Sequence, residues 1–182
     1  TDALGFRNGD HHESPGGVRK FTGKILSSIT TGSSLGGFSY NADSLKACSE
    51  MMLDIRREGL ELYVVIPPKH CVYYETLYQM GLWPAWETWK SDLIGMVDRA
   101  NEVPCAASPV RIWDFAVHND ATTEAIPEDP TITKMLNFVE VTHFNTTLGN
   151  QVVGVLFGEK PIGRLGAELT AGNLSKHLSE LR

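Results

Sequence analysis

Glu140 and His143 have the residue types and the spacing of a general-base pair. They are three positions apart, and in a turn or a first helical turn this spacing brings both side chains to one side. A carboxylate bound to one imidazole nitrogen fixes the tautomer of the ring and leaves the other nitrogen to accept a proton. Glu-x-x-His pairs also arise by chance, so a solvent-exposed pair without a catalytic role is the alternative.

Further candidate side chains follow two segments that we predict to be buried strands. Residues 60–66 are almost continuously apolar, which is typical of a strand covered on both faces, and residues 110–116 form a second such run. Ligands in open α/β sheets bind beyond the carboxyl ends of the strands. The candidates for substrate binding at these ends are Lys69, His70, Asp114 and His118. A structural role is the alternative for each, and Asp114 in particular could cap its loop.

The elements around these strands read as helices. Apolar residues recur at helical spacing over 43–58, and Gly59 suits the left-handed position that ends a helix. The residues between the two strands are also mostly helical in pattern, with breaks near Gly81 and Pro84. A strand, a helical crossover and a second strand form a βαβ unit, whose strands are parallel.

We therefore predict an α/β fold with a parallel, three-layer, flavodoxin-like sheet. Only two strands are clear, whereas open α/β sheets usually have about five. The sheet is thus expected to be incomplete within this chain, unless the glycine-rich N-terminal arm adds strands. We divide the chain into that arm, residues 1–42, an α/β unit, residues 43–158, and a Gly/Pro linker with a C-terminal helix, residues 159–182. Shorter helices are predicted over 131–137 and after Asn145 or Thr146.

Composition excludes several classes of function. The 182 residues include 16 Lys and Arg against 22 Asp and Glu, a net charge of −6, which argues against binding to nucleic acid or to an anionic membrane. No apolar run approaches the roughly 18 residues of a membrane span, and we find no targeting signal at the start of the chain. The three Cys form no Cys-x-x-Cys pair. Adjacent His11 and His12 rarely converge on one ion, so we predict neither a metal site nor a cofactor.

Three tryptophans, Trp83, Trp86 and Trp89, lie three positions apart. Aromatic rings of this kind can stack on sugar rings. Helical spacing beside Leu82 and Leu93 favours the alternative, a contribution to the hydrophobic core.

The order of several short motifs resembles the C-terminal end of SGNH (Gly-Asp-Ser-Leu type) hydrolases. These motifs are a strand ending in Trp113-Asp114-Phe115, a carboxylate three residues before a histidine, and Leu148-Gly149 in a helix. Over roughly residues 41–182 the chain is also similar to bacterial envelope proteins that look related to polysaccharide O-acetyltransferases. The motifs shared with that group include Gly81-Leu82-Trp83, Thr122-Thr123-Glu124, His143-Phe144 and Leu156-Phe157-Gly158.

The resemblance implies an esterase or O-acyltransferase that acts on an envelope carbohydrate, in the periplasm or cell envelope. His143 would be the general base and Glu140 would orient it, although SGNH proteins usually have Asp at the Glu140 position. Their nucleophilic serine is not evident here: Ser33 and Ser34 have the right type, but a poor strand precedes them. The nucleophile would then come from a missing N-terminal half or a protein partner. A non-catalytic subunit or binding module of a larger assembly is the alternative.

Overall fold

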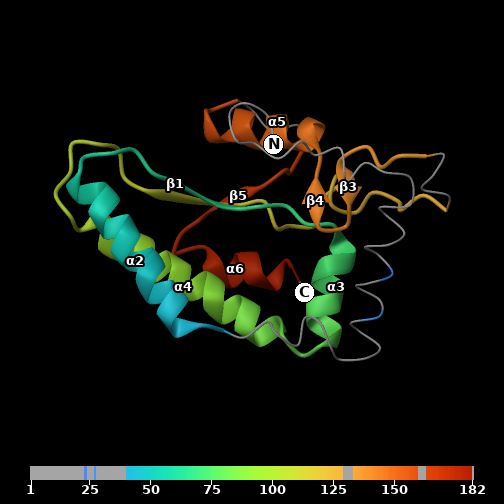
Figure 1. Ribbon diagram of the computed structural model, residues 1–182, viewed down its shortest axis with the longest axis horizontal. Helices are drawn as coiled ribbons and strands as arrows, with labels where there is room; N and C mark the ends of the chain where they lie inside the picture. The colour runs from blue at the N-terminus through green and yellow to red at the C-terminus, as the bar shows by residue number, and fades with distance from the viewer. Residues whose placement is uncertain (1–22, 24–26, 28–39, 129–132, 160–162, 182) are drawn as a thin grey trace, which may run out of the picture.

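A small mixed sheet lies at the centre of the molecule (Figure 1). The computed structural model describes residues 23, 27, 40–128, 133–159 and 163–181. The sheet contains β1 (Tyr63–Ile66), β2 (Arg111–Asp114) and β5 (Ala167–Leu169) in the order β1-β2-β5. β1 and β2 are parallel, as predicted from the βαβ pattern, whereas β5 is antiparallel to β2. The fold is therefore of mixed α and β type, and the prediction of a wholly parallel sheet is wrong.

Helices cover both faces of this sheet (Figure 1). Side chains alternate between the two faces along each strand. Ile66 and Ile112 join a core with residues of α2 (Ala42–Arg57) and α4 (Trp83–Asn101). Val65 and Trp113 pack on the other side, in a core that includes residues of α5 (Thr146–Leu156). Burial on both faces explains why the β1 and β2 segments are almost continuously apolar.

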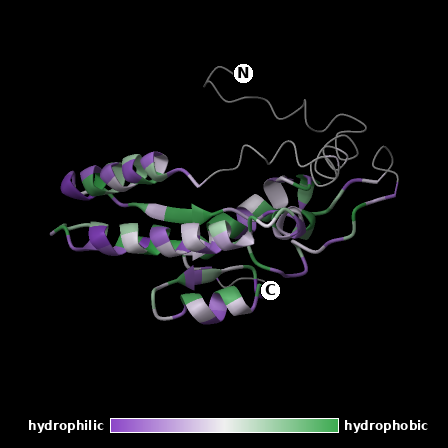
Figure 2. Cartoon of the chain, turned by 90° about the horizontal axis from the view of Figure 1, so that it is seen from below, coloured by the Kyte–Doolittle hydropathy of each residue, from purple (hydrophilic) through white to green (hydrophobic). Residues whose placement is uncertain are grey.

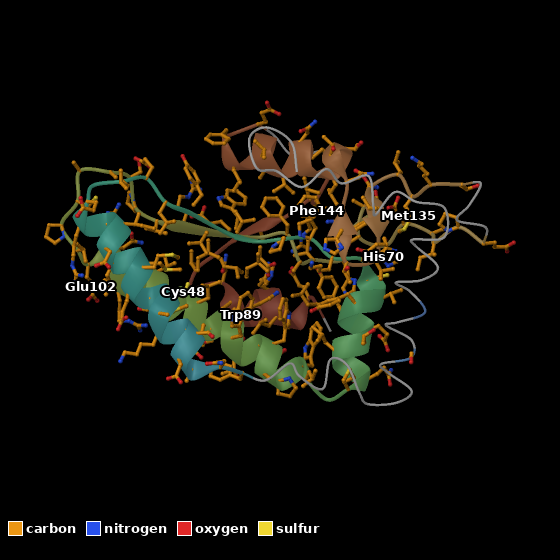
Figure 3. The ribbon with its side chains drawn as sticks, in the orientation of Figure 1. Cys48, His70, Trp89, Glu102, Met135 and Phe144 are labelled. Carbon is orange, nitrogen blue, oxygen red and sulfur yellow. The ribbon has the colours of Figure 1, made fainter. Side chains whose placement is uncertain are left out.

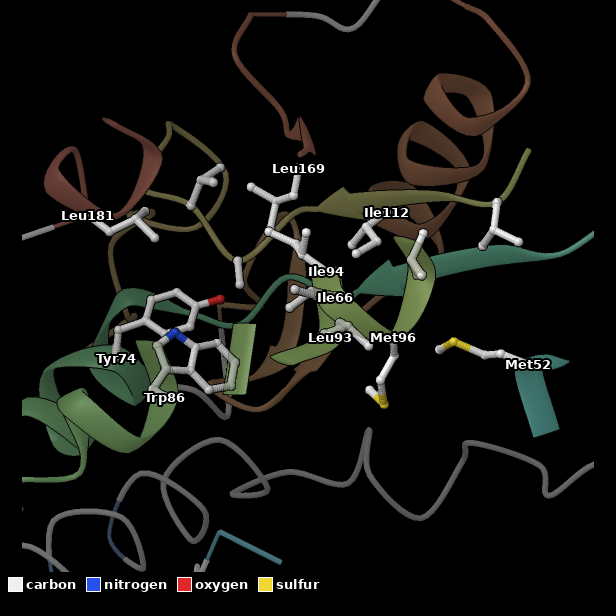
Figure 4. Close-up of a cluster of buried hydrophobic side chains, with 14 of the residues drawn as sticks. Met52, Ile66, Tyr74, Trp86, Leu93, Ile94, Met96, Ile112, Leu169 and Leu181 are labelled. Atoms are coloured by element: carbon white, nitrogen blue, oxygen red, sulfur yellow. The ribbon is translucent and has the colours of Figure 1, made fainter. Parts of the chain in front are cut away.

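The larger core lies between the sheet and α4, where Ile94 lies near Ile112 and Leu169, while Met96 points to the side of Met52 (Figure 4). The strand in the middle of Figure 2 is largely hydrophobic, whereas the helices beside it carry both hydrophilic and hydrophobic residues. Among the described residues, no helix combines the length and the apolar character needed to cross a membrane.

Local capping signals explain the helix ends. The Asn41 side chain accepts the Ser44 amide at 3.0 Å at the start of α2, and the Asn145 side chain accepts the Leu148 amide at 3.2 Å at the start of α5. Gly81, with φ of 70°, lies between α3 (Cys71–Gln79) and α4. The predicted break near Gly81 and Pro84 is thus confirmed, since Pro84 lies in the first turn of α4.

Three segments differ from the sequence predictions. β5 lies in the region predicted as a linker to the C-terminal helix α6 (Leu174–Ser179), and it completes the central sheet. Residues 133–137 are not helical, and 131–132 lie outside the described residues. The segment before α5 forms a two-stranded hairpin of β3 (Phe138–Glu140) and β4 (His143–Phe144). Most of the predicted arm, residues 1–42, also lies outside the described residues.

Candidate functional site

The β3–β4 hairpin brings Glu140 and His143 together. The two residues are cross-strand partners at the turn end of the hairpin. The turn is attached to the start of α3, because the His70 amide donates to the Val141 carbonyl at 3.1 Å. The predicted proximity of Glu140 and His143 is therefore present, in a hairpin turn rather than a helical one.

The Glu140 carboxylate is fully buried and has three donors around it. It accepts the Thr142 amide at 2.7 Å and the Thr142 hydroxyl at 2.7 Å, and His143 Nδ1 contacts its Oε1. A carboxylate can only accept, so this contact assigns the proton of a neutral His143 ring to Nδ1 and makes Nε2 the basic nitrogen. The His143 side chain is 57% exposed, so solvent reaches the imidazole.

Lys69 lies at the same turn. Its Nζ donates to the Thr142 carbonyl at 2.6 Å and lies 5.9 Å from the centre of the Tyr73 ring. Burial lowers the pKa of the Lys69 ammonium, and the negative charge of Glu140 partly opposes that change. Of the four predicted substrate-binding residues, Lys69 is the one that the structure places beside Glu140.

His70 is buried and caps the start of α3, which indicates a structural role. Its Nδ1 accepts the Val72 amide at 3.3 Å, which assigns the ring proton to Nε2, and Nε2 donates to the Glu124 carbonyl at 2.8 Å. Its side chain also meets the Phe138 ring edge to face, and Figure 3 shows it at the start of α3. Both ring nitrogens are therefore used by the backbone, and the expected contact of His70 with a substrate is not supported.

Asp114 is also fully buried, at the end of β2. Its Oδ2 accepts Lys90 Nζ at 2.6 Å and His177 Nε2 at 2.8 Å, and its Oδ1 accepts the Ala116 amide at 2.8 Å. Burial lowers the pKa of Lys90, and the charge of Asp114 opposes that change. Asp114, predicted as a substrate-binding residue with a loop cap as the alternative, is thus buried and caps the Ala116 amide.

The buried network of Lys90, Asp114 and His177 was not predicted from the sequence. One local signal was present, because Lys90 lies four residues after Trp86 and three before Leu93, on the apolar face of α4. A cation at such a position requires a buried partner. No such signal marks His177, which reaches Asp114 across 63 residues of sequence.

His118 contacts α3 rather than the Glu140 carboxylate. It is exposed in the loop after β2, and its ring lies 5.9 Å from that of Tyr74, edge to face. His118 also lines a pocket beside α3. The structure thus brings Glu140, His143 and Lys69 together at the hairpin turn, whereas His118 packs on Tyr74 of α3.

The loop after β2 also supports the hairpin. The Glu124 carboxylate accepts the Leu136 amide at 2.9 Å and the Asn137 amide at 2.9 Å, which holds the chain that leads into β3.

Within the described ranges, no group of three or more His, Cys, Asp or Glu side chains is arranged to hold a metal ion.

Comparisons of the chain with family models, with curated proteins and with solved structures found no match.

Proposed function

We propose that the chain is an SGNH-like component of an esterase or O-acyltransferase, in which His143 is the general base. The observation that carries the proposal is the contact between His143 Nδ1 and the fully buried carboxylate of Glu140. A buried carboxylate orients the imidazole and stabilises the imidazolium that forms when Nε2 takes a proton. The motif resemblance supports a carbohydrate O-acyl group as substrate, a three-layer SGNH-like fold and a place in the cell envelope.

The proposed step is acyl transfer to a hydroxyl group. His143 Nε2 removes the hydroxyl proton as the hydroxyl oxygen bonds to the ester carbonyl carbon. The tetrahedral intermediate then collapses, the ester C–O bond breaks, and the imidazolium returns its proton to the leaving alkoxide. Ser33 and Ser34 lie outside the described residues. Because a poor strand precedes these serines in the sequence, we propose that the nucleophilic serine belongs to a missing N-terminal half or to a partner protein. For the chain alone, water would be the acyl acceptor.

One observation favours the alternative of a non-catalytic module. Glu140 accepts the amide and the hydroxyl of Thr142, and these bonds by themselves stabilise the hairpin turn. In that case His143 would help to stabilise the hairpin turn and would not accept protons from a substrate. The two candidates differ in whether removal of the imidazole changes a rate or only the stability.

Hydrolysis of p-nitrophenyl acetate by the whole chain tests the proposal. We expect the second-order rate constant of the wild-type chain to exceed that of N-acetylhistidine, and His143→Ala to lower it by about 10²-fold or more, the smaller end of general-base contributions. Glu140→Gln is expected to lower it as well, because the amide no longer stabilises the imidazolium. Equal rates for the wild type and His143→Ala would remove His143 from catalysis. Acetate release from acetylated xylan then tests the carbohydrate substrate.

A further inference from the structure

A pocket of about 260 Å³ lies between α3, the loop after β2 and the end of the chain. Figure 1 shows the C-terminus beside α3, so these segments meet although they are distant in sequence. The residues that line the pocket are Tyr74, Glu75, Tyr78, Trp83, His118 and Leu181. Its volume is just below the roughly 300 Å³ at which small-molecule sites begin, which fits a ligand of about one ring.

A smaller pocket of about 30 Å³ adjoins the first one. The two pockets share His118 and Leu181. The smaller pocket is also lined by Arg164, His177 and Glu180, and Arg164 and Glu180 form an ion pair there. Its volume is enough for a water molecule or for one polar substituent of a ligand.

The topology supports a binding role at this place. α3 follows β1, and His118 lies four residues after the last residue of β2. The pocket therefore lies beyond the carboxyl ends of the two parallel strands, where ligands bind in open α/β sheets.

The walls combine aromatic rings with charges of both signs. Tyr78 is 61% exposed and lies edge to face with the Trp83 ring, with 6.5 Å between ring centres. An anionic ligand would meet the carboxylate of Glu75 in the larger pocket. A charged substituent of either sign in the smaller pocket would meet a like charge of the Arg164–Glu180 ion pair. A neutral ring with several hydroxyl groups avoids both repulsions and uses both the donors and the acceptors. Its apolar face would pack on the Tyr78 ring.

One side chain of the smaller pocket is held rigidly by buried charges. His177 is 6% exposed, and its Nε2 donates to Asp114, which also accepts Lys90. These bonds fix the orientation of the imidazole before any ligand arrives, which reduces the entropy cost of binding. The buried network thus gives the pocket a preorganised polar wall.

We propose that this pocket binds a neutral, hydroxyl-bearing ring of the size of one sugar residue. Tyr78 provides the apolar contact, and His118, with the polar groups around His177, provides hydrogen bonds. This binding site is additional to the proposed general base at the hairpin turn. Sugar binding there does not require that the chain transfers acyl groups.

Saturation-transfer NMR with the whole chain tests this site. The probes are D-glucose, D-galactose and N-acetyl-D-glucosamine, with acetate and tetramethylammonium, which both carry methyl protons, as charged comparators. We expect transfer to the ring protons of at least one sugar, and weaker binding of the charged probes. Tyr78→Ala and His118→Ala should each raise the dissociation constant about three- to tenfold, the contribution of one aromatic or hydrogen-bonding contact.

Tyr63→Ala is the matched control. Tyr63 is also an exposed tyrosine, at 47%, but it begins β1 at the opposite end of the strand, so its removal should leave sugar binding unchanged. Absence of transfer to all three sugars would overturn the proposal. Wild-type affinity in both pocket variants, or tighter binding of a charged probe than of every sugar, would overturn it as well. Sugar binding by a His143→Ala chain that lacks hydrolysis would separate this site from the proposed catalytic one.

Discussion

The ammonium group of Lys90 and the carboxylate of Asp114 face each other in the protein interior, with 2.6 Å between Nζ and Oδ2. Neither side chain is exposed to solvent. Lys90 comes from α4 and Asp114 ends β2, so the ion pair joins a helix to the central sheet. His177 of α6 donates to the same oxygen, which brings the C-terminal helix to this point too.

Removal of both charges of this pair should destabilise the fold by less than the sum of the two single removals. Asp114→Asn is expected to lower the free energy of unfolding by about 3–5 kcal/mol, because Lys90 would remain buried without a compensating charge. Lys90→Met should have a similar effect. The double variant should lose clearly less than the sum of the two single losses, as measured by urea denaturation. Additive losses would mean that the two groups do not interact.

The buried ammonium also predicts a dependence of stability on pH. Burial lowers the pKa of Lys90 below its ordinary value of 10.5. Between the lowered value and 10.5 the unfolded chain binds more protons than the folded chain, so the contribution of Lys90 to stability increases as the pH rises. The difference in unfolding free energy, wild type minus Lys90→Met, should therefore increase from pH 8 towards pH 10.5. A difference that stays constant or falls would contradict this sign.

His70 should matter for stability because it joins α3 to the loop after β2. His70→Ala removes both the cap on the Val72 amide and the hydrogen bond to the Glu124 carbonyl. We expect a loss of about 1–3 kcal/mol in thermal or chemical denaturation. His70→Asn can still cap the Val72 amide and should recover part of that loss. An unchanged stability of His70→Ala would show that neither bond contributes.

Gly166 is expected to accept no larger side chain. A Cβ atom built there would lie 2.7 Å from Phe115 Cδ1 and 3.0 Å from the Asp114 carbonyl oxygen. Gly166→Ala should therefore lower the unfolding free energy by about 1–3 kcal/mol, since the buried Phe115 ring or the backbone must shift. Gly172→Ala is the control, because its nearest contact is Thr170 Oγ1 at 3.8 Å. Equal stabilities of the two variants would contradict the close packing of Gly166.

Local signals in the sequence predicted a large part of the fold. The start of α5 was predicted at Asn145 or Thr146, and the structure shows Asn145 as the cap of the Leu148 amide. β1 and β2 follow from their apolar runs, and their parallel pairing follows from the helices between them. β5 has only three residues, Ala167–Leu169, and it forms because β2 offers a free edge. Such a strand depends on a distant partner and leaves no periodic pattern.

The candidate site also combines contacts between residues close in sequence, which could be predicted, with contacts between distant residues, which could not. Glu140 and His143 could be paired from the sequence because they are three residues apart and meet within one hairpin. The roles of His70 and Asp114 depend on distant partners, the Glu124 carbonyl and the side chains of Lys90 and His177. Sequence spacing predicts that such polar residues lie near strand ends, but their burial is decided by tertiary packing.

The protonation state of the His143 ring tests the central claim most directly, namely that buried Glu140 holds this imidazole as a base. Long-range ¹H–¹⁵N NMR of the whole chain, recorded at a pH where the ring is neutral, distinguishes its two nitrogens. We predict a ring with the proton on Nδ1 and an unprotonated Nε2, and a loss of this preference in Glu140→Ala. A neutral ring with its proton mainly on Nε2, or the same distribution in the variant, would contradict the account.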